Sequence, residues 1–123
     1  MQCQNFRSRL GLLKMKHYPQ MSYSVTTDHK TPQYTDFDIV ALEGPCKVIA
    51  ERDEFYGGKK SKPYVGKLLV NPTWGQLFIE AMKQQQNTLD FHHSFLEGGR
   101  IVGTVKNENG ETIVQFINLS LGS

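Results

Sequence analysis

Two adjacent histidines, His92 and His93, are the side chains of this chain best suited to proton transfer near neutral pH. Carboxylates lie close to His93 on both sides in the sequence, at Asp90 and Glu97. A carboxylate that hydrogen-bonds an imidazole orients the ring and supports general acid–base catalysis. His93 paired with Asp90 or Glu97 is therefore the catalytic hypothesis, for a small enzyme of the lyase, isomerase or hydrolase kind.

The same histidines are poor candidates for a metal centre. In a strand, His92 and His93 would point to opposite faces and would not share one ion. In a helix, His93 and Glu97 would lie one turn apart, but the chain has no HExxH motif and no third ligand at a useful spacing. The two cysteines, Cys3 and Cys46, form no CxxC pair. We expect no metal and no cofactor.

A glycine-rich basic loop, Gly57–Lys62, is the second candidate site. It could hold a phosphate group or a nucleic-acid backbone, with Tyr56 and Tyr64 beside it as stacking surfaces. It lacks the GxxxxGK[ST] order of a P-loop, and loop lysines are usually just solvated. We keep phospholigand or nucleic-acid binding as an alternative function. The anion-binding candidates are Lys59, Lys60 and Lys62.

The element that must position these groups is Asn71–Gln86, the only long segment with a clean helical period. Asn71 is expected to cap this helix and Pro72 to occupy its first position. One face is apolar, at the helical spacing of Trp74, Leu77, Phe78, Ala81 and Met82. This face must pack on a sheet, because no second amphipathic helix of comparable quality is present. The polar side is expected to face solvent, with Gln76, Glu80, Lys83, Gln84, Gln85 and Gln86.

Most of the remaining chain shows strand patterns. Strands are predicted at 21–26, 37–42, 46–52 and 64–70 before the helix, and at 89–97, 100–106 and 111–121 after it. Gly98-Gly99 is interpreted as a turn, and Asn109-Gly110 predicts a hairpin with Lys106 opposite Glu111. The predicted fold class is α+β, a curved, mostly antiparallel sheet in the order β-β-β-β-α-β-β-β packed on one long helix.

The last predicted hairpin is apolar on both faces. One face is expected to hold Ile101, Gly103, Val105, Val114 and Phe116. The other is expected to hold Val102, Thr104, Ile113, Gln115, Ile117 and Leu119. One helix can cover only one face of a sheet, so the other face must meet another sheet, the N-terminal strands or a second copy of the chain. Of these we favour a second copy, as a homodimer.

Length and composition are typical of one soluble domain. The chain has 123 residues, of which 38% are hydrophobic and 21% charged, and no apolar run long enough to span a membrane. Residues 1–20 are predicted to be a flexible basic segment, with Met15 and Met21 as alternative starts, and residues 21–123 to be a single domain. The two isolated cysteines favour a reduced, cytoplasmic protein.

The charge is unevenly distributed. Residues 1–27 contain four basic and no acidic side chains, whereas residues 28–123 contain ten basic and twelve acidic ones. The predicted domain is thus slightly acidic, and a general nucleic-acid surface is not indicated.

The leading functional hypothesis is a non-enzymatic, dimerising protein that binds a small apolar or aromatic ligand beside the helix. A ligand there would lie in a cleft between helix and sheet. Core packing explains Trp74 and Phe78 better than a stacking role does. The ligand-binding candidates are Trp74, Phe78, Phe91, His93 and Phe95.

Overall fold

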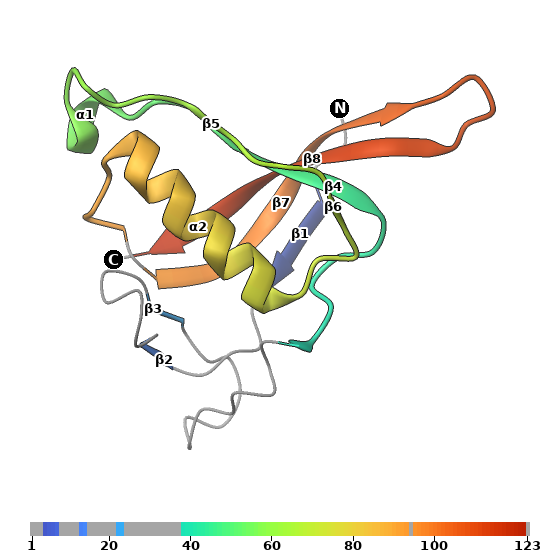
Figure 1. Cartoon of the computed structure of the whole chain (residues 1–123), viewed down its shortest axis with the longest axis horizontal. Coiled ribbons are helices and arrows are strands. Elements are labelled where there is room, and N and C mark those ends of the chain that lie inside the picture. The colour runs from blue at the N-terminus through green and yellow to red at the C-terminus, as the bar shows by residue number, and fades with distance from the viewer. Residues whose placement is uncertain (1–3, 8–12, 15–21, 24–37, 94, 123) are drawn as a thin grey trace.

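The protein has an α+β fold in which one long helix lies against a sheet that does not close (Figure 1). The computed structural model describes residues 4–7, 13–14, 22–23, 38–93 and 95–122. The predicted fold class, a mostly antiparallel sheet packed on one main helix, is confirmed. None of the helices in these residues is long and apolar enough to cross a membrane.

The described residues form eight strands and two helices. They are β1 (Gln4–Arg7), β2 (Leu13–Lys14), β3 (Ser22–Tyr23), β4 (Pro45–Ala50), α1 (Glu54–Gly57), β5 (Tyr64–Val65), β6 (Leu69–Val70), α2 (Trp74–Thr88), β7 (Phe95–Lys106) and β8 (Thr112–Gly122). The strand order is β2-β3-β7-β8-β4-β5, with β1 also paired to β7 and β6 to β4. Two pairs are parallel, β3 with β7 and β4 with β8. The path from β4 to β8 includes α2, as a parallel connection requires.

Helix α2 begins at Trp74 because Thr73, and not the predicted Asn71, caps it. The Thr73 hydroxyl accepts the N–H of Gln76 at 3.2 Å, and the Gln76 side chain accepts the N–H of Thr73 at 2.9 Å. Asn71 instead has a positive φ of 48° and accepts the N–H of Gly44 at 2.6 Å. The predicted apolar face is confirmed as core, with Trp74, Leu77, Phe78, Ala81 and Met82 all buried.

The prediction that the polar side of α2 faces solvent is wrong for three residues. Glu80, Gln84 and Gln85 are only 1%, 9% and 1% exposed. The segment that carries β5 runs alongside the helix and covers this side (Figure 1). The Tyr64 hydroxyl donates to Glu80 Oε1 at 2.8 Å, and the other carboxylate oxygen lies 3.7 Å from the Lys83 ammonium. Helix α2 is therefore covered on more than its apolar face.

The predicted strand at 37–42 is wrong in its described part, and so is the predicted turn at Gly98-Gly99. Residues 38–44 form a loop with one isolated bridge, between Val40 and Thr73. The two glycines lie inside β7, next to a register irregularity between Leu96 and Gly98. The predicted strands at 64–70 and 89–97 are also shorter than expected. Gly66–Leu68 separates β5 from β6, and β7 begins only at Phe95.

The predicted β4 strand and the last hairpin are confirmed, but the hairpin register differs. Lys106 pairs with Thr112 and not with Glu111. A further irregularity between Ile101 and Gly103 places Ile101 opposite Ile117. The predicted division of faces is therefore wrong: Ile101 joins Ile117 and Leu119 in the core. Gly103, Val105, Val114 and Phe116 pair on the other face, which we call the outer face of the sheet.

Residues 1–20 contain two short strands of the sheet, β1 and β2. β1 pairs antiparallel with residues 98–101 of β7. β2 pairs with β3, the described part of the strand predicted at 21–26. The rest of these two segments, including Met15 and Met21, lies outside the described residues.

We expect Tyr64→Phe to destabilise the protein, because it removes the hydroxyl that hydrogen-bonds the buried Glu80 carboxylate. A hydrogen bond to a charged group contributes roughly 1.5–3 kcal/mol, and urea denaturation should show a loss of that size. Tyr56→Phe is the matched control, because the Tyr56 hydroxyl makes no hydrogen bond to a described residue and its side chain is 44% exposed. Equal stability of the two variants would contradict this role for Tyr64.

The raised pKa of the buried Cys46 thiol predicts that the protein loses stability at alkaline pH. Burial, and secondarily the charge of Glu80, raises the pKa of this thiol to about 11, from 9.0 in the unfolded chain. The contribution of the neutral thiol to the free energy of unfolding is complete below pH 9 and is lost as the pH rises toward 11. Between these values the thiol ionises in the unfolded chain but stays protonated in the folded one. In urea denaturation, the stability of wild type relative to Cys46→Ala should fall by about 2 kcal/mol between pH 8 and pH 10.5. A constant difference across that range would refute the assignment.

Candidate functional site

The main groove of the described structure lies where the sheet splits. β4 follows β8 only as far as the pair Val48–Ile117, and beyond Ala50 the chain turns away toward α1. The Asn118 Nδ2 group donates to the Ile49 carbonyl at 2.7 Å at the point of separation. The resulting groove has a volume of about 870 Å3. It is lined by Ile49, Ala50, Glu51, Pro63, Tyr64, Val65, Gln84, Arg100, Val102, Gly103, Phe116, Asn118 and Leu119.

The groove extends from the outer face of the sheet down to helix α2. Phe116 belongs to the outer face, and Val65, which also lines the groove, is 68% exposed. Gln84 comes from α2 and is 91% buried. The Oε1 atom of Gln84 is enclosed and has no hydrogen-bond partner among the described residues. An unpaired buried amide oxygen costs roughly 1–3 kcal/mol, so a ligand donor that reached it on binding would recover that cost.

Gln85, the neighbour of Gln84, also has a buried Oε1 without a partner among the described residues, but its amide nitrogen is bonded. Its Nε2 group donates to the carbonyls of Asp90 and His93, at 3.3 and 3.4 Å. Gln85 does not line the groove. It therefore holds the turn after α2, whereas Gln84 faces the groove.

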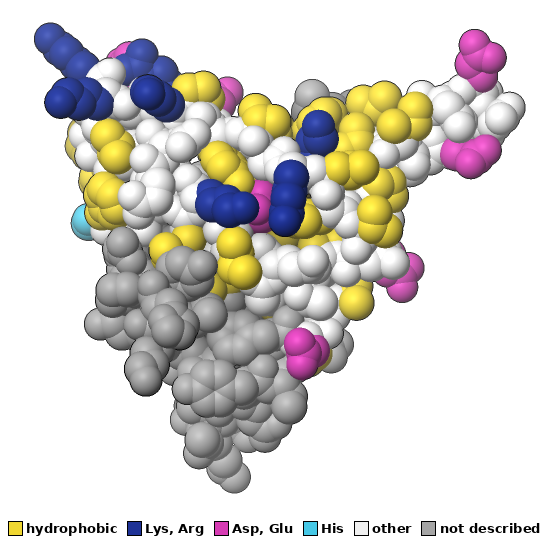
Figure 2. All heavy atoms as spheres, in the orientation of Figure 1, with side chains coloured by type: hydrophobic (Ala, Val, Ile, Leu, Met, Phe, Trp, Pro, Cys, Tyr) yellow, Lys and Arg dark blue, Asp and Glu magenta, His cyan; other side chains and the backbone are white. Residues whose placement is uncertain are grey.

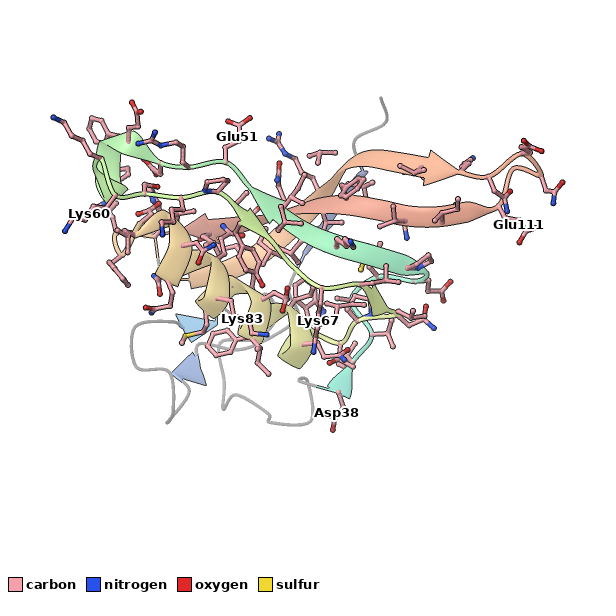
Figure 3. All side chains as sticks on the ribbon, turned by 45° about the horizontal axis from the view of Figure 1, so that its top comes forward. Asp38, Glu51, Lys60, Lys67, Lys83 and Glu111 are labelled. Atoms are coloured by element: carbon pink, nitrogen blue, oxygen red, sulfur yellow. The ribbon has the colours of Figure 1, made fainter. Side chains whose placement is uncertain are left out.

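Charge at the groove is confined to its rim. Arg100 is exposed on β7, pairs across the sheet with Asn118, and makes no ion pair with a described residue. Glu51 is exposed in the segment that follows β4, where its side chain points outward (Figure 3). Between them the walls are apolar, chiefly Ile49, Val102 and Phe116. This combination suits a ligand with an apolar body and an anionic end near Arg100.

His93 is joined to Asp90 and not to Glu97. His93 Nδ1 lies 2.8 Å from Asp90 Oδ2, and Asp90 Oδ1 accepts the N–H groups of His92 and His93 at 3.1 and 3.3 Å. Glu97 is exposed on β7, beside Gly122. The pair fixes the imidazole and leaves Nε2 for hydrogen bonding or proton transfer. His93 does not line the groove, so the two features are separate.

The basic loop and the histidines, which are far apart in the sequence, meet at one end of the molecule. The Tyr56 ring is stacked on His92, with centroids 4.6 Å apart and planes 3° apart, and meets His93 edge-on at 5.0 Å. Phe55 packs edge-on against Tyr56 at 4.7 Å. We call this surface the basic aromatic corner. It consists of Phe55, Tyr56, Lys59, Lys60, Lys62 and His92.

Hydrogen bonds close the loop and hold it against the end of α2. The Asp53 carboxylate caps α1 by accepting the N–H groups of Phe55 and Tyr56, both at 3.0 Å. The Asp53 N–H donates to Ser61 Oγ at 2.7 Å, and the Lys62 N–H to the Asn87 carbonyl at 2.8 Å. The stacking of Tyr56 on His92 is therefore built into the fold.

The predicted ligand-binding residues whose side chains are described do not line the groove. Trp74 is 2% exposed and Phe78 is fully buried, and both belong to the core. Phe91 is 49% exposed in the turn after α2, and His93 is paired with Asp90. Phe95 begins β7, and its side chain is outside the description.

Sequence reasoning missed the groove residues Gln84, Arg100, Val102, Phe116 and Asn118 as a group. The one available signal was Gln84, a polar residue next to the apolar stripe of the helix. Among the described residues, no three His, Cys, Asp or Glu side chains are grouped to hold a metal ion. Comparison with protein-family models, curated proteins and solved structures finds no match.

Proposed function

We propose that this is a cytoplasmic protein that binds a small amphipathic ligand in the groove, without catalysing a reaction on it. The observation that carries the proposal is the enclosed Gln84 Oε1, unpaired among the described residues, at a groove of about 870 Å3. Ligand sites in proteins typically measure about 300–1,000 Å3 and combine apolar walls with a few polar groups. The buried, reduced thiol of Cys46 supports a reducing compartment.

The lining specifies the chemistry of the ligand. Gln84 Oε1 requires an N–H or O–H donor at the deep end. Val102 and Phe116 favour an aromatic or branched apolar body. Arg100 at the rim favours a carboxylate or sulfonate group. The ligand class is therefore an apolar acid that carries an amine or hydroxyl donor.

Binding without turnover is supported by the side chains that face the groove. Among the described residues, the lining contains no histidine, cysteine or serine, and the Tyr64 hydroxyl is already bonded to Glu80. Covalent catalysis needs a nucleophile with an adjacent base, which these residues do not supply. The His93–Asp90 pair has such a proton-transfer group but lies outside the groove.

The probe 1-anilinonaphthalene-8-sulfonate has the three required features, an N–H donor, fused rings and a sulfonate. We expect it to bind wild type with enhanced fluorescence. Arg100→Gln should weaken binding on the order of ten-fold, because it removes a charge-assisted hydrogen bond. Gln84→Leu should weaken binding while raising the free energy of unfolding by about 1 kcal/mol, because it removes an unpaired buried polar group.

Ile113→Ser is the matched control, because it removes an exposed apolar side chain that does not line the groove. Its probe affinity should equal that of wild type. Wild-type affinity in both groove variants, or equal loss in the Ile113→Ser control, would rule out this groove as the ligand site.

A second candidate function, homodimerisation, is favoured by the outer face of the sheet. Val65 on β5 and Val105 on β7 are 68% and 44% exposed on this face. Exposed β-branched side chains on a sheet are commonly covered by a symmetric copy. A dimer formed in this way would close the mouth of the groove over its ligand.

We expect light scattering of the full chain at tens of micromolar to give twice the monomer mass of 14.0 kDa. Val65→Lys combined with Val105→Lys should shift the protein to the monomer, because two buried, unpaired ammonium groups oppose association. Val40→Lys, on a side chain 48% exposed in the loop before β4, is the control and should remain dimeric. A wild-type mass of 14.0 kDa would disprove the dimer.

A further inference from the structure

The basic aromatic corner concentrates positive charge that the net charge of the chain conceals. Figure 2 shows basic side chains gathered at the end of the molecule that carries α1, and acidic ones at the tip of the β7–β8 hairpin. Figure 3 shows Lys60 pointing outward at the first end and Glu111 at the second. Lys59, Lys60 and Lys62 are all exposed, and none makes an ion pair with a described residue.

The acidic groups near the corner are engaged elsewhere. The Asp53 carboxylate accepts two N–H groups of α1. Glu54 lies 3.3 Å from the Arg52 guanidinium, and Asp90 is bonded to His93 and to the turn N–H groups. Since these carboxylates are bonded to other groups and not to the lysines, the three ammonium groups remain available to contact an anion from solution.

The same corner presents aromatic rings to solvent. Phe55 is 86% exposed, the most exposed large hydrophobic side chain in the described structure, and Tyr56 is 44% exposed. Phe55, Tyr56 and His92 form a continuous series of ring contacts. This series is held by the hydrogen bonds of the α1 loop, so its rings require little further ordering when a partner stacks on them.

We infer that the basic aromatic corner binds single-stranded nucleic acid. Exposed rings stack on unpaired bases, and adjacent lysines contact the phosphates, which is the combination that single-strand binding proteins use. A duplex has no free base faces for Phe55. The site is independent of the groove and of the proposed ligand.

The composition of the corner favours a nucleic acid over an anionic membrane. Membrane-surface segments insert a broad apolar face some 5–10 Å into the bilayer, usually from a long amphipathic helix. Here α1 has only four residues, and the rings next to Phe55 are the polar-edged Tyr56 and His92. Stacking needs only the ring faces, which the corner provides.

The test is fluorescence anisotropy of the full chain with labelled oligodeoxythymidylate of fifteen bases and with its duplex, from low to physiological salt. We expect the single strand to bind more tightly, with log affinity falling with log salt at a slope of about −2 for three phosphate contacts. The double variant of Lys59→Ala and Lys60→Ala should flatten that slope by about 1.4. The double variant of Lys67→Ala and Lys106→Ala removes the same charge elsewhere and should leave the slope unchanged.

Stacking is tested separately from charge. Phe55→Leu keeps an apolar side chain but removes the ring, and should weaken single-strand binding on the order of ten-fold. Phe55→Trp should retain wild-type affinity. Since Phe55 is 86% exposed, both variants should melt at the wild-type temperature.

Three results would overturn the inference. The first is no binding of the single strand at low salt, including the case in which phosphatidylserine vesicles bind instead. The second is equal loss in the two lysine double variants, which would mean nonspecific attraction. The third is wild-type affinity in Phe55→Leu, which would mean that no base stacks on the ring.

Discussion

The buried carboxylate of Glu80 is the constraint on which the arrangement of this fold depends. Removing a charge from water is costly unless it is paired and hydrogen-bonded, and Glu80 is only 1% exposed. Its partners come from two places, Tyr64 on β5 and Lys83 one turn along α2. A side chain at Gly66 would collide with the carboxylate, so glycine is needed where the chain passes closest to it. The charge thus ties the β5 segment to the side of the helix.

That attachment determines both candidate sites. With β5 held against α2, the strand pair β4–β5 diverges from β8 beyond Ala50, and the groove opens between them. The chain between β4 and β5 must then bridge to the far end of α2, where Lys62 bonds Asn87 and Tyr56 stacks on His92. One buried ion cluster therefore positions a groove in the middle of the sheet and a loop at its end.

The fold class and the core were predictable, because they depend on local periodicity. The apolar spacing of Trp74, Leu77 and Phe78 and the Asn109-Gly110 turn each specify structure within a few residues. The groove was not predictable, because it depends on register. The irregularity between Ile101 and Gly103 places these two residues on opposite faces of the sheet, although their spacing predicts the same face. No residue type indicates it. The burial of Glu80 and Gln84 was missed for a related reason: their cover comes from β5, which forms only in the tertiary structure.

The two candidate surfaces also show why overall charge was a poor guide to partners. The described structure separates its charges by position, with lysines at the α1 loop and Glu108 and Glu111 at the opposite hairpin tip (Figure 2). Screening in physiological salt limits the reach of a charge to about 8 Å, so a ligand at the corner is affected by the lysines and not by the distant hairpin. The local arrangement of charges, and not the net charge of the chain, therefore decides which ligands this end of the molecule attracts. The Asp90 and Asp53 carboxylates contribute to this arrangement through hydrogen bonds that hold the rings in place.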